Sequence, residues 1–67
     1  MNERFRWRMQ AADMREKLAG DYVFIGRLNW ELGHAKRANT SIKKAYDLKI
    51  EADVFRDEAE QYRNSEE

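Results

Sequence analysis

The chain has 67 residues with no cysteine and no proline, 39% of its residues are charged, and its formal net charge is zero. A domain of this size buries only about 60% of the surface of its unfolded chain, so small domains commonly depend on disulfides, metals or oligomerisation. Without cysteine, disulfides and thiolate zinc sites are excluded, and we expect oligomerisation to supply the missing stability.

Composition also argues against several classes of function. There is no run of about 18 apolar residues, so we expect no membrane span. The chain is charged from Glu3 onward and lacks an apolar signal core, which favours a cytoplasmic protein. There is no glycine-rich phosphate loop and no cluster of metal-ligating residues. His34 follows Glu31 by three residues, but a lone histidine near a helix end is more often a surface residue. We therefore expect no enzyme activity, no metal and no cofactor.

The charges are unevenly distributed along the chain. Residues 51–67 carry a net charge of −5, which cancels +2 over residues 1–20 and +3 over residues 21–50. Such asymmetry can steer a partner or align two copies head to tail. The alternative interpretation is a solvated surface with an acidic tail.

With no proline and few glycines, the sequence predicts an all-α fold. Gly20 suits the left-handed position after a helix and Asp21 can cap the next one, while Asn39-Thr40-Ser41 predicts a second break. We expect helices at about 3–19, 22–38 and 41–63, with Asn2 as the first cap and a frayed acidic tail at 64–67. These helices would form one domain, a small three-helix bundle with coiled-coil-like packing. The alternative is a helical hairpin whose long C-terminal helix runs unbroken from 22 to 63 and needs a partner chain.

The first expected helix has two apolar faces. Its first face follows core spacing over the whole helix, and its second face is shorter and lies roughly opposite. The first consists of Trp7, Ala11, Met14 and Leu18, and the second of Phe5, Met9 and Ala12. Two apolar faces require two neighbours, so we expect one of them to contact a partner. The alternative is that Phe5 and Met9 cover the end of the bundle.

The second expected helix carries a predicted core face made of Phe24, Ile25, Leu28, Leu32 and Ala35. Val23 and Trp30 lie on its other side. Gly26 and Gly33 are seven residues apart along one edge. They indicate either a close approach of another backbone, or a helix that simply ends before His34.

The third expected helix has the most regular pattern. Alanine recurs every seven residues from Ala38 to Ala59, and Leu48, Phe55 and Tyr62 recur with the same period. This is the pattern of a coiled-coil contact with closely spaced helices, which would join either two chains or helices of the same chain. The predicted protein-binding residues are Phe5, Trp7, Met9, Ala12, Trp30, Ala45, Leu48, Ala52, Phe55, Ala59 and Tyr62.

The segment AKRANTSIKKAYDL, Ala35 to Leu48, resembles the turn region of helix-turn-helix repressors. Asn39 stands where glycine usually makes the turn, and Ser41 would cap the recognition helix. Thr40 and Ala45 depart from the buried aliphatic residues of that motif. The resemblance implies DNA binding, with phosphate contacts from Lys36, Arg37, Lys43, Lys44 and Lys49.

The sequence thus favours a small helical protein-binding module that forms a homodimer. Its expected role is that of an adaptor or inhibitor that covers a partner's surface, as phage and plasmid accessory proteins do. The alternative is a DNA-binding regulator that uses the basic segment 35–49.

Overall fold

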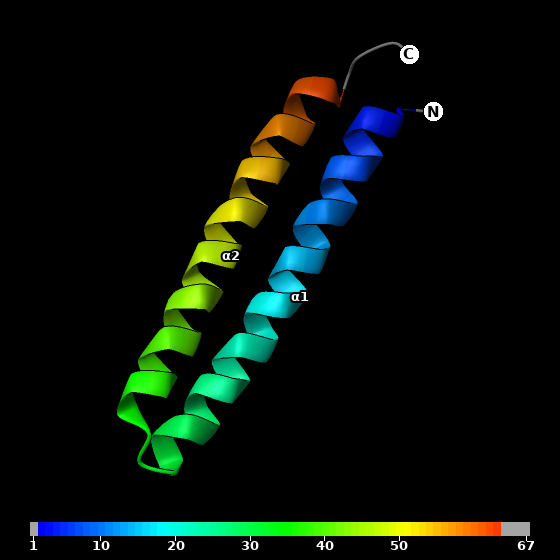
Figure 1. Ribbon diagram of the computed structural model, residues 1–67. Coiled ribbons are helices and arrows are strands. Elements are labelled where there is room, and N and C mark those ends of the chain that lie inside the picture. The colour runs from blue at the N-terminus through cyan, green and yellow to red at the C-terminus, as the bar shows by residue number, and fades with distance from the viewer. Residues whose placement is uncertain (1, 64–67) are drawn as a thin grey trace.

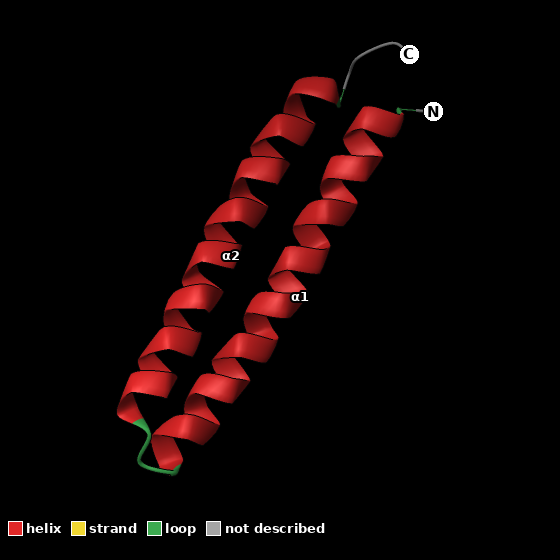
Figure 2. Cartoon of the chain, viewed as in Figure 1, coloured by secondary structure: helices red, strands yellow, loops and turns green. Residues whose placement is uncertain are grey.

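Two antiparallel α-helices joined by a short turn make up the fold (Figure 1). The computed structural model describes residues 2–63, in which α1 spans Glu3–Glu31 and α2 spans Ala35–Tyr62. No strand occurs among these residues (Figure 2), so the predicted all-α class is confirmed. The hairpin measures 53 × 14 × 9 Å. Each helix is about 42 Å long at 1.5 Å per residue, so the two helices face each other over almost their whole length.

The predicted three-helix bundle is wrong, because α1 continues through Gly20-Asp21 and α2 continues through Asn39-Thr40-Ser41. A glycine inside a helix costs only about 1 kcal/mol relative to alanine, which packing along a long helix readily offsets. The alternative, a helical hairpin, is confirmed as an arrangement of two helices, but its second helix begins at Ala35 and not at residue 22, because the chain reverses between Glu31 and Ala35. The predicted fraying of residues 64–67 lies outside the described residues.

The chain reverses at Gly33, which has a φ of +82°. Only glycine adopts this conformation without steric cost. The Gly33 N–H donates to the Trp30 carbonyl at 3.0 Å, and the His34 N–H donates to the Asn29 carbonyl at 2.8 Å. These two bonds form a Schellman motif that satisfies the last carbonyls of α1. Of the two alternatives for Gly33, the helix end is therefore the one observed.

At the open end of the hairpin, Asn2 connects the two helices. Its Oδ1 accepts a hydrogen bond from the Phe5 N–H at 3.1 Å, which confirms Asn2 as the cap of α1. Its Nδ2 donates to the carbonyl of Tyr62, the last residue of α2. One side chain thus satisfies a free donor of α1 and a free acceptor of α2.

Small residues at heptad spacing form the contact between the helices. An ideal Cβ placed on Gly26 would lie 3.3 Å from the Ala38 carbonyl oxygen, so the two backbones approach closely there. Ala19 and Ala45 belong to one buried cluster with Leu48. The same register places Ala12 level with Ala52. We call this set the small-residue row: Ala12, Ala19 and Gly26 of α1, with Ala38, Ala45, Ala52 and Ala59 of α2.

The predicted core faces are wrong. Met14 of the first predicted face is 66% exposed, and Phe24 of the second is 63% exposed. Leu48 is the one large hydrophobic side chain among residues 2–63 that is buried. The physical reason is that two closely spaced helices leave room only for small side chains between them. Of the two arrangements that the sequence leaves open, the alanine repeat therefore joins two helices of one chain.

The variant Ala52→Leu should destabilise the hairpin, because Ala52 is fully buried in the small-residue row. Overpacking of this kind costs about 1–3 kcal/mol, and each kcal/mol lowers the melting temperature of so small a protein by roughly 4–8 °C. Thermal melts followed by circular dichroism would measure this. The matched control Ala35→Leu adds the same side chain at an exposed position and should melt close to the wild type. Equal melting temperatures for both variants would contradict the close packing of the two helices at the small-residue row.

Candidate protein-binding surfaces

Arginines of α1 close one side of the helix contact. The guanidinium of Arg15 lies 4.6 Å from the centre of the Phe55 ring, and its Nε is 3.0 Å from Glu51. Seven residues earlier, Arg8 lies 4.5 Å from the centre of the Tyr62 ring and 3.1 Å from Glu58. This repeated arrangement covers the aromatic residues that flank the small-residue row. The arginines of the N-terminal RFRWRMQ stretch thus include one that the fold itself uses.

Arg56 of α2 closes the opposite side. Its guanidinium contacts Glu16 at 2.8 Å and Asp13 at 3.3 Å, so it bridges to two carboxylates of α1. The hydrogen bond to Glu16 is the main cause that raises the pKa of Arg56 above its ordinary value, and burial opposes it. An arginine is already protonated at any ordinary pH, so this bridge is insensitive to the titration of Arg56.

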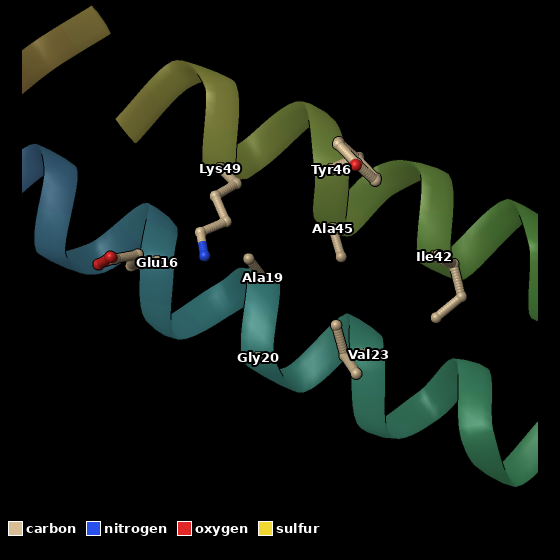
Figure 3. Close-up of a pocket in the computed structure, with 8 residues that line it drawn as sticks. All are labelled: Glu16, Ala19, Gly20, Val23, Ile42, Ala45, Tyr46 and Lys49. Carbon is tan, nitrogen blue, oxygen red and sulfur yellow. The ribbon is translucent and has the colours of Figure 1, made fainter. Parts of the chain in front are cut away.

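A groove of about 590 Å³ lies beside the Glu16–Arg56 pair, toward the turn (Figure 3). Ala19 and Ala45 of the small-residue row form its floor. Figure 3 shows Lys49 extending from α2 toward α1 at the end where Glu16 lies. The groove therefore combines an apolar interior with charged groups at one end. Its lining residues are Glu16, Ala19, Gly20, Val23, Ile42, Ala45, Tyr46 and Lys49.

Gly20 lines this groove, and neither its backbone conformation nor a close neighbour requires a glycine there. Gly33 is required by its positive φ, and a Cβ on Gly26 would lie 2.7 Å from the Ile42 Cδ1. A Cβ on Gly20 would meet no atom within 4 Å. The glycine costs about 1 kcal/mol of helix propensity relative to alanine, and its local effect is to keep the groove open.

A second apolar surface runs along α1 outside the groove, and its Trp7 also contacts Phe55 of α2, with 5.7 Å between the ring centres. The exposed fractions of its large side chains range from 42% at Ile25 to 72% at Leu32. Exposed apolar residues arranged in a continuous strip are typical of a contact surface. We call this set the outer stripe: Trp7, Ala11, Met14, Leu18, Ile25, Leu28 and Leu32.

The predicted protein-binding residues divide into three groups. Trp7 and Trp30 are exposed, at 56% and 64%. Four are half-buried at the edges of the helix contact: Phe5, Met9, Phe55 and Tyr62. Five are buried inside the hairpin, between its own two helices: Ala12, Ala45, Leu48, Ala52 and Ala59.

The groove was missed at the sequence level, although one signal was present. In the sequence, Gly20 suits the position after a helix, and Val23 lies on the side away from the predicted core face. The signal was Gly20, because a glycine inside a helix that makes no turn can indicate an open surface.

The predicted basic residues do not form a helix-turn-helix motif. Asn39 lies inside α2, so the described residues contain no turn at that position. The lysines and arginine are nevertheless exposed on the first half of α2. By helical spacing, Lys36, Arg37, Lys43 and Lys44 lie on the part of α2 away from the groove, whereas Lys49 lines the groove.

Comparison with known proteins gives no relative: no protein-family model, curated protein or solved structure matches this chain. Neither described helix contains a segment long and apolar enough to cross a lipid bilayer.

Alanine at the two helical glycines should give different results. Gly20→Ala should raise the free energy of unfolding by up to about 1 kcal/mol, since the methyl group meets no atom and alanine is the better helix former. Gly26→Ala should lose most or all of that gain, because Ile42 and the Ala38 carbonyl must move. Urea denaturation of the two variants would measure both. An equal gain at both positions would contradict the close approach of the helices at Gly26.

Proposed function

We propose that this protein is a small helical protein-binding module, an adaptor or inhibitor, whose groove accepts an apolar segment of another protein. The observation that carries the proposal is Gly20, which lowers helix stability yet leaves the groove rim open. The exposed apolar side chains beside it, such as Val23 and Tyr46 at 42% and 70% exposed, supply contact area. We further propose that the module acts as a homodimer in the cytoplasm.

The shape of the groove favours a helix or an extended peptide as its ligand. It lies between the two antiparallel helices and has a floor of small side chains. This geometry is typical of a groove that binds a helix. Its volume is in the range of about 300–1,000 Å³ that is common for ligand sites. Lys49 and Glu16 at one end can fix the orientation of a polar group that flanks the apolar segment.

Gly20→Leu should abolish partner binding while leaving the hairpin at least as stable as the wild type. Leucine is a better helix former than glycine. A Cβ at this position would meet no atom within 4 Å, and the rest of the leucine side chain would add bulk to the lining of the groove. The partner would be captured from the native host and purified, and its affinity for each variant measured by titration calorimetry.

The matched control is Asp57→Leu, which adds leucine at an exposed position of α2 outside the groove. It should bind the partner like the wild type. If Gly20→Leu binds the purified partner with unchanged affinity, the groove is not the binding site.

A second candidate function is DNA binding, favoured by the exposed basic residues Lys36, Arg37, Lys43 and Lys44 near the turn. Without a helix-turn-helix, such a patch would contact phosphates rather than read base edges. Each phosphate contact releases counterions, so the affinity would fall steeply with salt.

Reversing the charge of Lys43 and Lys44 to Glu should eliminate DNA retardation in a gel shift at low salt, since two phosphate contacts are replaced by repulsion. The control Arg6→Glu with Arg27→Glu makes the same charge change at exposed positions of α1 and should retain binding. A wild type that does not retard DNA at low salt removes this candidate.

A further inference from the structure

We propose that the outer stripe of α1 is the interface of an antiparallel homodimer, in which the stripe of one hairpin packs on the stripe of a second copy. This inference deepens the homodimer of the proposed function by assigning its surface and orientation. It does not depend on the groove, because no residue of the stripe lines the groove.

The spacing of the stripe is that of a coiled coil. From Trp7 to Leu32 its positions alternate between steps of four and three residues. The repeat has one position that is not apolar, Asp21, which lies between Leu18 and Ile25. Such a pattern packs best on another helix with the same pattern. Within the chain, α2 already packs on α1 through the small-residue row. A helix that matches the stripe would therefore come from another chain.

The stripe is self-complementary when reversed about a twofold axis between residues 19 and 20. Each position then meets a stripe position of the second copy: Trp7 with Leu32, Ala11 with Leu28, Met14 with Ile25, and Leu18 with Asp21. Ala11, the smallest residue of the stripe, therefore lies opposite the larger Leu28. A symmetric dimer of this kind uses the same surface on both chains.

Charge selects the antiparallel orientation. In a parallel pair, the Asp21 carboxylates of the two copies would face each other inside the contact, which is unfavourable. In the antiparallel pair, Lys17 of the second copy lies almost level with Asp21 and can reach its carboxylate. The one charged position in the stripe thus acquires a partner of opposite sign.

The area is sufficient for a specific dimer. Six large side chains of the stripe are between 42% and 72% exposed. At roughly 100 Å² for each of them, two copies would remove about 1,200 Å² from water, the lower end of the range for stable interfaces. Residues flanking the stripe would add to this area.

Sedimentation equilibrium of the purified chain tests the dimer. The wild type should have twice its monomer mass of 8.1 kDa at tens of micromolar. Leu18→Glu should weaken the dimer by at least about 100-fold, since a carboxylate would be buried in the contact on each copy. Asp21→Leu should strengthen it, and this variant gives a result even if Leu18→Glu unfolds. A monomeric wild type, a dimeric Leu18→Glu or a weakened Asp21→Leu would overturn the proposal.

Two controls separate this interface from the groove. Val54→Glu introduces a carboxylate at a side chain of α2 that is 49% exposed, and it should remain dimeric. Gly20→Leu fills the groove and should also remain dimeric, even though it should lose the protein partner. If Gly20→Leu is monomeric instead, the groove holds the second copy and the stripe does not.

Disulfide trapping tests the orientation, because the chain has no cysteine of its own. Met14→Cys and Ile25→Cys chains, one of them carrying a tag, would be mixed and oxidised mildly. The antiparallel register brings these two positions together, so the trapped dimer should contain one chain of each kind. Trapped dimers of identical chains alone would indicate a parallel pair and overturn the assignment.

Discussion

The close approach of two helices through glycine and alanine is the constraint on which the rest of this structure depends. Because the carbonyl of Ala38 lies against Gly26, the space between the helices cannot hold leucine-sized side chains along the small-residue row. Large apolar residues are therefore displaced to the edges and outer faces, where they remain partly in water. The hairpin has an ordered helix contact but buries little apolar surface, which is an arrangement that benefits from partners.

Charge pairs set the register of that contact. Alanine rows alone would tolerate a shift of one heptad, since the pattern repeats every seven residues. Arg8 and Arg15 must each lie over an aromatic ring and beside a glutamate of α2, and Arg56 must reach Asp13 and Glu16. Exposed pairs of this kind contribute only modestly to stability. Here they oppose a change of register between the helices, because a shift of one heptad would separate several pairs of opposite charges at once.

The helical class, the Asn2 cap and the heptad alanines could be predicted from the sequence, because each depends on local chemistry or on a simple period. The positions of the breaks could not. Gly20 and Gly33 have equal local preference for ending a helix. The turn forms at Gly33 because the small residues of α1 and α2 can then pair along the whole length of both helices. The large residues led to a wrong core for a related reason: hydrophobic periodicity identifies a contact face, but it does not say which chain supplies the contact. The groove is lined by residues 16–23 of α1 and 42–49 of α2, which come together only in the folded hairpin, so no local pattern predicted its shape.

The Schellman turn at Gly33 also has a consequence for the order of folding. Contacts next to the turn join residues close in sequence, such as Gly26 and Ala38, whereas the last one, between Asn2 and Tyr62, closes a loop of nearly the whole chain. The entropy lost on closing a loop grows with its length. The hairpin should therefore close from the turn outward, each heptad of small residues bringing the next into range. Folding would then be fast and dominated by local contacts, and the open end, which is farthest from the turn, would be the first part to separate when the protein unfolds.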